Sequence, residues 1–153
     1  MRRFLTPIVL ALLPTAALAS GWTADMQDDE GGQVLVASVS GAPEGNITPS
    51  LELMCGGSEG IMLRYLMTSD EGTPGSEADF LFENESQQVT LHMVYEDMDG
   101  AFAAYVPKTD PMVALLENGA DVFISEASGN FPAQDFSLKG STKAIGKVLA
   151  GCP

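Results

Sequence analysis

The residue types that most often carry chemistry are scarce in this sequence, which contains two cysteines, Cys55 and Cys152, and one histidine, His92. In an oxidising compartment a single pair of cysteines most simply forms one disulfide. A redox-active or metal-binding pair normally has closely spaced cysteines, and these two lie far apart in the chain. We therefore predict a structural disulfide between Cys55 and Cys152. It closes a loop of about 100 residues and stabilises the fold by roughly 4–5 kcal/mol.

His92 is the residue around which nucleophilic catalysis or a soft metal site would have to be built. A Ser-His-Asp triad needs a nucleophile, and we expect no nucleophile elbow of the Gly-x-Ser-x-Gly type. The neighbouring Met93 is a ligand type found at copper sites, but adjacent strand residues point to opposite faces and cannot share one ion. We expect His92 to be an exposed or hydrogen-bonded structural residue. We predict no catalytic residue, no metal and no cofactor.

Acidic residues are abundant, with 21 aspartates and glutamates against seven lysines and arginines. This abundance means that paired carboxylates carry no information about acid–base catalysis. Residues 96–100 have the composition of a calcium loop, but they lack the ligand number and the distal glutamate of a helix-loop-helix site. We expect an Asp-Gly turn that joins two strands of a hairpin there.

The first residues have the organisation of a secretory signal peptide. A basic start precedes an apolar stretch over residues 4–13 and the small-x-small cleavage site Ala17-Leu18-Ala19. The alternative, an uncleaved membrane anchor, needs about 20 apolar residues, more than this stretch has. We predict a signal peptide over residues 1–19, cleavage between Ala19 and Ser20, and one β-rich exported domain over residues 20–153. The domain is expected to be periplasmic or secreted, without stable membrane insertion.

Charge limits the class of partner. Loss of the two arginines in the signal peptide changes the formal net charge from −14 to −16. A negative field of this size repels nucleic acid and anionic membranes, and it speeds encounter with a basic partner. The same charge also keeps a protein soluble without any partner. We therefore expect no nucleic-acid partner and a protein partner whose identity the charge does not give.

The rest of the chain consists mostly of short, alternating apolar stretches separated by turn residues, which is the pattern of β-strands. The clearest is residues 89–95, with Val89, Leu91, Met93 and Tyr95 on one face. The predicted strands cover residues 22–27, 33–40, 50–55, 61–67, a stretch around Phe80 and Phe82, and residues 89–95, 101–106, 120–125 and 135–138. The spacing predicts a mainly β fold. We expect an antiparallel β-sandwich, or a partly open barrel, with two short helices, the second C-terminal.

Capping residues mark both predicted helices. Asp110 and Pro111 fit an N-cap and a first helical position, and Gly119 is a suitable stop. Ser141 is the expected cap of the second helix. This helix should bury one apolar stripe, formed by Ala144, Ile145, Val148 and Leu149. It ends at Cys152, so the predicted disulfide would pin it to the strand that ends at Cys55.

Two runs carry a family resemblance, Leu51-x-Leu-x-Cys55 and Phe136-Ser-Leu-Lys-Gly-Ser-Thr-Lys-Ala-Ile-x-x-Val-Leu-x-x-Cys152. They are similar to the VasI/TagO-like periplasmic accessory proteins of type VI secretion. The residues that fit are Trp22, Leu51, Leu53, Cys55, Leu116, Gly119, Phe136, Leu138, Gly140, Ala144, Ile145 and Cys152. The chain lacks the extra N-terminal cysteine-containing segment of those proteins and is more acidic. The resemblance implies a shared fold and the same disulfide, and it supplies no catalytic residue.

Three functions are consistent with these observations. The first is a non-enzymatic exported module that contacts an envelope or secretion-system protein through a sheet face or edge. The alternative, motivated by the charge, is an acidic inhibitor of a basic secreted enzyme such as lysozyme. A hydrolase that uses His92 or a carboxylate pair is the third, and no substrate suggests itself.

Overall fold

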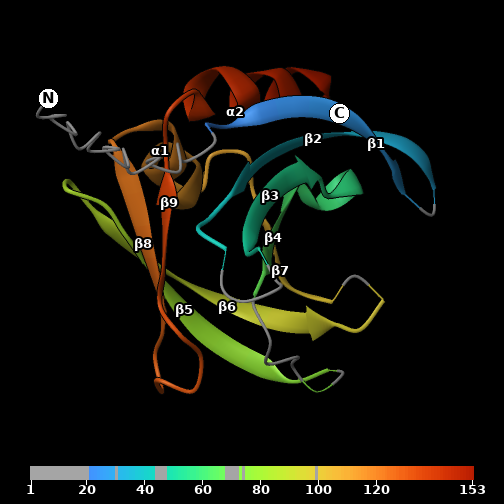
Figure 1. Cartoon of the computed structure of the whole chain (residues 1–153). Coiled ribbons are helices and arrows are strands. Elements are labelled where there is room, and N and C mark those ends of the chain that lie inside the picture. The colour runs from blue at the N-terminus through green and yellow to red at the C-terminus, as the bar shows by residue number, and fades with distance from the viewer. Residues whose placement is uncertain (1–20, 30, 44–47, 68–72, 74, 99) are drawn as a thin grey trace, which may run out of the picture.

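The computed structural model describes residues 21–29, 31–43, 48–67, 73, 75–98 and 100–153 (Figure 1). The predicted signal peptide and its cleavage site lie outside the described residues. The described elements are β1 (Thr23–Asp29), β2 (Gly32–Ser40), β3 (Ser50–Cys55), the 3-10 turn η1 (Gly57–Glu59), β4 (Ile61–Leu66), β5 (Glu77–Glu83), β6 (Gln88–Glu96), β7 (Ala101–Val106), α1 (Pro111–Glu117), β8 (Asp121–Glu126), β9 (Gln134–Ser137) and α2 (Ser141–Gly151). No helix within the described ranges is long and apolar enough to cross a membrane.

These strands form one antiparallel sheet in the order β1-β2-β3-β4-β7-β6-β5-β8-β9. Hairpins supply most neighbours, but two pairings are distant in sequence: Leu63 of β4 lies opposite Ala104 of β7, and Phe82 of β5 lies opposite Ile124 of β8. The sheet is strongly curled (Figure 1) and is not closed, so β1 and β9 remain its edges. The predicted mainly β, antiparallel fold with two short helices is confirmed.

The two edges of the sheet come together beside α2. The Trp22 N–H, just before β1, donates to the Lys139 carbonyl, just after β9, at 2.8 Å. Near the other end of β2, Gly41 lies against the Phe136 ring so closely that a Cβ at this position would be 3.1 Å from it. Residues that flank β1 and β2 thus contact β9 and the residue after it across the gap in the sheet, which leaves a partly open barrel around the core.

The core fills the inside of the curled sheet. Most inward residues of the central strands are buried, as the alternating pattern requires. Its largest side chains include four aromatic rings that pack edge to face, with centroids 5.0–6.0 Å apart: Tyr65, Phe80, Phe102 and Phe136. Helix α1 adds four buried residues (Met112, Val113, Leu115 and Leu116) to the same core.

Helix α2 covers β1, β2 and β3 on the inner side of the sheet, with Ala144, Ile145 and Val148 buried (Figure 1). The Cys55–Cys152 disulfide is present, with 5.4 Å between the two Cα atoms. It joins the end of β3 to the residue that caps α2, as the sequence predicted.

One cap is wrong in the sequence-based prediction. Ser141 does not cap α2: it is buried and is the first helical residue, and the N-cap is Gly140, without a side-chain hydrogen bond. Gly140 has a φ of 84°, and a Cβ there would lie 3.2 Å from the Trp22 carbonyl oxygen. The tight turn into the helix therefore requires a glycine. The prediction for α1 is confirmed, since Asp110 Oδ1 accepts from the Met112 N–H at 2.9 Å.

The outer face of the sheet carries a second, smaller hydrophobic cluster. It consists of Val36, Met54, Met62 and Ala103, with Val34 packed against it. The tip of the β1–β2 hairpin bends over these residues, because Asp29 and Val34 line the same surface hollows as the outward side chains of β3 and β4. In β2 the sequence predicted one buried face, yet outward-facing Val36 is only 1% exposed. Bending of the hairpin buries this second face.

Candidate functional site

A cavity of about 530 Å³ opens where β5 begins and β8 ends. Its polar side is formed by Glu77 and Asp79 of β5 and by His92 of β6. The loop after β8 forms the opposite side. The apolar part of the lining includes Phe102 and Phe131, whose rings are 5.4 Å apart. The volume falls within the range of small-molecule sites, but most of the lining residues are polar, whereas such sites are lined mainly by apolar side chains.

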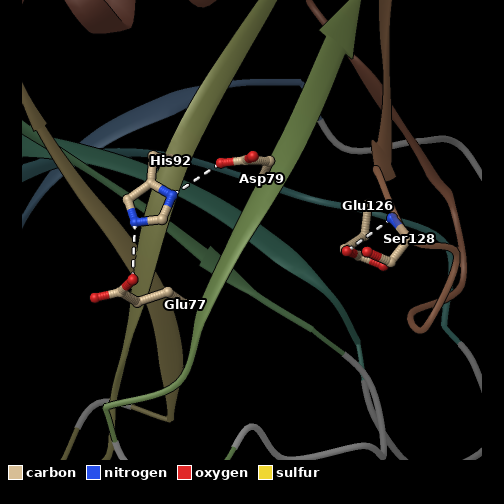
Figure 2. Close-up of polar contacts among 5 residues, drawn as sticks. All are labelled: Glu77, Asp79, His92, Glu126 and Ser128. Carbon is tan, nitrogen blue, oxygen red and sulfur yellow. Dashed lines mark hydrogen bonds and ion pairs between the residues drawn. The ribbon is translucent and has the colours of Figure 1, made fainter.

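The imidazole of His92 lies between two carboxylates (Figure 2). Its Nδ1 is 2.8 Å from Asp79 Oδ1, and its Nε2 is 3.3 Å from Glu77 Oε2. The hydrogen bond to Asp79 raises the pKa of His92 above its ordinary value of 6.5; desolvation opposes this shift, and the charges of Glu77 and Asp79 add to it. The arrangement favours a ring that is protonated at both nitrogens.

His92 is both exposed and hydrogen-bonded, which is the position expected for it. Both ring nitrogens face carboxylates, so neither is directed at a serine or at a metal. Met93, the neighbouring residue, is fully buried on the other face of β6 and cannot reach the same ion. Within the described ranges no group of three or more His, Cys, Asp or Glu side chains is arranged to hold a metal.

Residues 56–60 (Gly-Gly-Ser-Glu-Gly) match the Gly-x-Ser-x-Gly sequence, so the sequence alone does not exclude a nucleophile elbow. Their structure is not that of a nucleophile elbow. An elbow joins a strand to a helix and holds its serine on a strained turn. Here the 3-10 turn η1 joins strands β3 and β4, with the Gly56 N–H donating to the Gly60 carbonyl at 3.0 Å. The segment is a hairpin connection, which is the structure expected for it.

Glu126 is a buried carboxylate at the far side of the cavity (Figure 2). The Ser128 and Asn130 N–H groups donate to its two oxygens at 2.9 and 2.7 Å. Burial alone raises the pKa of Glu126, but these backbone hydrogen bonds outweigh it and hold the pKa below its ordinary value of 4.5. The ionised carboxylate therefore shapes the loop that closes one side of the cavity.

A second hollow, of about 430 Å³, lies on the outer face between the tip of the β1–β2 hairpin and the β6–β7 turn. We call it the hairpin-tip groove; its lining is Asp29, Gly31, Met62, Arg64, Glu96, Asp97, Met98 and Tyr105. Two large apolar side chains in it are exposed, Met98 by 80% and Tyr105 by 49%. Arg64 forms an ion pair with Glu96 at 3.7 Å. The groove thus combines exposed apolar surface with carboxylates.

The β6–β7 turn beside this groove is the predicted Asp-Gly turn. Its Gly100 N–H donates to the Asp97 carbonyl at 3.3 Å, and Gly100 has a φ of 60°, which favours glycine. The strands that it joins pair from Val94 opposite Ala103 to Glu96 opposite Ala101.

Charge is unevenly distributed over the surface. Exposed lysines gather at α2 and the turn before it: Lys139, Lys143 and Lys147. The other two described basic residues are engaged within the fold, since Arg64 contacts Glu96 and Lys108 Nζ donates to the Cys152 and Pro153 carbonyls at 2.8 and 2.6 Å. Exposed carboxylates dominate elsewhere, notably on β5 and at the hairpin-tip groove.

Sequence reasoning found the disulfide but missed the partners of His92. The signal was available: Glu77 and Asp79 are two residues apart on one face of β5, and β5 forms a hairpin with β6. Register then places Asp79 directly opposite His92.

No family model, no curated protein and no solved structure matches this chain. The resemblance to VasI/TagO-like accessory proteins therefore stays a hypothesis.

Proposed function

We propose that this chain is a non-enzymatic, exported binding module that contacts a basic surface of an envelope or secretion-system protein. The observation that carries the proposal is the hairpin-tip groove, where the exposed Met98 and Tyr105 lie among carboxylates. Aromatic and methionine side chains are enriched at protein interfaces, and surrounding charge steers an oppositely charged partner. The disulfide and the signal-like N-terminus support export.

The charge distribution supports a basic partner in particular. Carboxylates of Asp29, Glu96 and Asp97 surround the groove, and Arg64, the basic residue in its lining, is already paired with Glu96. A partner that brings lysine or arginine side chains would meet complementary charge at the rim and apolar surface at the centre.

The test is capture from the native envelope under mild crosslinking, with the wild type and two matched variants. The Met98→Ser/Tyr105→Ser double variant should lose the captured protein. Phe123→Ser should retain it, because Phe123 is similarly exposed but lies on β8, outside the groove. The captured protein should be basic and should dissociate as salt rises. Equal capture by all three proteins, or capture of no basic protein by the wild type, contradicts the proposal.

A second candidate is an inhibitor of a basic secreted enzyme such as lysozyme. It is favoured by the formal charge, −14 before and −16 after loss of the two N-terminal arginines. Lysozyme activity measured with added protein should fall at low salt and recover at high salt. Full activity at low salt with excess protein excludes this candidate.

A further inference from the structure

We propose that the free edge of β1 binds an extended acidic segment of another protein, which adds a strand to the sheet beside α2. This site lies at the opposite end of β1 from the hairpin-tip groove and does not depend on it. Three features carry the inference: an open groove, an unprotected strand edge, and a local excess of positive charge.

The groove lies between β1 and α2 and has a volume of about 280 Å³; we call it the β1–α2 groove. Its strand side is formed by residues 22–25, and its helix side by Gly140, Lys143, Ala144 and Lys147. Neighbouring strand residues point to opposite faces, so a hollow lined by four in a row runs along the edge of the strand. The helix residues recur every three or four positions and therefore share one side of α2, which lies along this part of β1 (Figure 1).

The edge of β1 at this groove can accept another strand. Seven consecutive residue pairs join β1 to β2, and no other described strand pairs with β1. Antiparallel pairing uses the backbone groups of alternate residues, so the remaining groups point away from β2. Trp22 belongs to this outward set, because its N–H donates to the Lys139 carbonyl across the gap in the sheet. Alternation then directs the backbone groups of Ala24 and Met26 outward as well.

The other edge of the sheet is protected in ways that β1 is not. Strand β9 has only four residues, and Pro132 stands two residues before it. Short edge strands and prolines discourage pairing with another chain. Strand β1 has seven residues and contains neither proline nor lysine. Addition of a strand is therefore expected at β1.

Charge at the β1–α2 groove favours an acidic occupant. No acidic residue follows Asp135, and this last part of the chain holds three of its seven lysines and arginines, namely Lys139, Lys143 and Lys147. Lys143 and Lys147 are exposed and line the groove, and Asp25 is the single carboxylate among the described residues of the lining. A segment that carries carboxylates would meet complementary charge there.

The spacing of the two lysines indicates the sequence pattern of the occupant. Lys143 and Lys147 lie one turn apart on α2, about 6 Å along the helix axis. Side chains on one face of a strand recur at every second residue, about 6.8 Å apart. A strand bound to β1 can thus place acidic side chains at alternate positions opposite the two ammonium groups. The expected ligand is an extended segment with an acidic-x-acidic pattern.

A second copy of this chain fits the edge less well. Pairing of two β1 strands would bring Asp25, Asp28 and Asp29 of both copies close together. Like charges opposite each other on a sheet are destabilising. Charge therefore favours an acidic segment of a different protein over self-association.

The test is fluorescence anisotropy of a labelled, blocked peptide, acetyl-Thr-Glu-Val-Glu-Val-Glu-Thr-amide, with the full chain at about 0.1 M salt. The same peptide with glutamine in place of glutamate is the matched ligand control. It should bind about fivefold more weakly, because two surface ion pairs are lost. The Lys143→Gln/Lys147→Gln double variant should weaken binding of the acidic peptide by a similar factor. Lys139→Gln removes a lysine outside the groove lining and should change binding less than about twofold.

Backbone pairing is tested with two N-methylated forms of the acidic peptide, methylated either on the glutamates or on the valines. Each form loses the N–H groups of one strand edge only. The form whose remaining N–H groups face β1 should bind like the parent peptide, and the other form should not bind. Bound parent peptide should also slow hydrogen exchange of the Ala24 and Met26 amides, measured by NMR.

Several outcomes would overturn the proposal. They are absence of binding by the acidic peptide, equal binding of the glutamine peptide, equal effects of the two N-methylated forms, and a loss with Lys139→Gln as large as that of the double variant. Sedimentation of the protein alone should show a monomer, and a dimer that excludes the peptide would assign the edge to a second copy. The Met98→Ser/Tyr105→Ser variant should bind the peptide like the wild type, because both residues lie in the hairpin-tip groove.

Discussion

The region under α2 and the region around His92 are built on opposite principles. Under α2, apolar side chains are fully buried and a covalent bond holds the end of the helix to β3. Around His92, charged side chains are more than half exposed, and hydrogen bonds and charge hold them together. The first region stabilises the fold, and the second can change its contacts with little loss of unfolding free energy. Substitutions in the two regions should therefore differ in their effect on stability.

Loss of the disulfide should have the largest effect. Cys55→Ala/Cys152→Ala should lower the free energy of unfolding by roughly 4–5 kcal/mol, because the unfolded chain regains the entropy of a loop of about 100 residues. Urea denaturation followed by circular dichroism measures it. A loss below about 1 kcal/mol would mean that packing of α2, and not the bond, holds this region together.

Truncation of a core side chain should have the second-largest effect on the unfolding free energy. Phe80→Ala should cost about 3–4 kcal/mol, because Phe80 is fully buried and its ring packs against Tyr65 and Phe102. The exposed Phe123→Ala is the matched control and should change the unfolding free energy by less than about 1 kcal/mol. Similar losses for both variants would contradict the assignment of the core.

Truncation of a side chain in the outer hydrophobic cluster should have an intermediate effect on the unfolding free energy. It also tests whether this cluster holds the bent β1–β2 hairpin in place. Met62→Ala should cost about 2 kcal/mol, at the low end for a buried methionine, because this cluster is small. Amide hydrogen exchange in Val34 and Val36 should accelerate in the variant, since the hairpin tip loses its contact. Unchanged exchange there would show that the hairpin is held by other contacts.

The hydrogen bonds of Glu126 should make its contribution to the unfolding free energy depend on pH. Its folded-state pKa is lowered, so the stabilisation is present above the unfolded value of about 4.5 and is lost as pH falls through the folded pKa. Glu126→Gln should cost about 1 kcal/mol at neutral pH and less in acid. Urea midpoints at several pH values test this. An unfolding difference that does not shrink in acid would contradict an ionised Glu126.

His92 should have the smallest effect on stability, with the opposite sign of pH dependence. Its folded-state pKa is raised, so the stabilisation is present below 6.5 and is lost as pH rises through the folded pKa. His92→Gln should match the wild type in alkaline buffer and be slightly less stable in acid. An NMR titration of the ring should place its pKa above 6.5, and a value below this would contradict the pairing with Asp79 and Glu77.

Local patterns in the sequence were sufficient to predict the strands and the two helices. The disulfide was predicted because the chain has only two cysteines. Alternation identified Val89, Leu91, Met93 and Tyr95 as one face of β6, and three of them are buried. Asp110 followed by Pro111 predicted the start of α1. These features depend on near neighbours in the chain, and so a single sequence reveals them.

Features that depend on distant segments were not predictable in the same way. The burial of Val36 follows from bending of a hairpin, and alternation within β2 carries no sign of it. The cap of α2 is Gly140 and not Ser141 because the Trp22 backbone, from the opposite end of the chain, passes close to it. The partners of His92 lie nearer in the chain, on the adjacent hairpin strand, and the sequence would have given them only together with the register between β5 and β6.

The hydrogen bond from Trp22 to Lys139, together with the disulfide, sets the order in which the molecule can mature. A chain that emerges with its N-terminus first presents its opening strand and one thiol long before their partners exist. Neither can pair until Lys139 and Cys152 have emerged, because long-range contacts form only after the intervening chain is available. From the emergence of Cys55 until that of Cys152, the edge of β1 and the Cys55 thiol therefore lack their final partners, and the disulfide can form only after Cys152 is available.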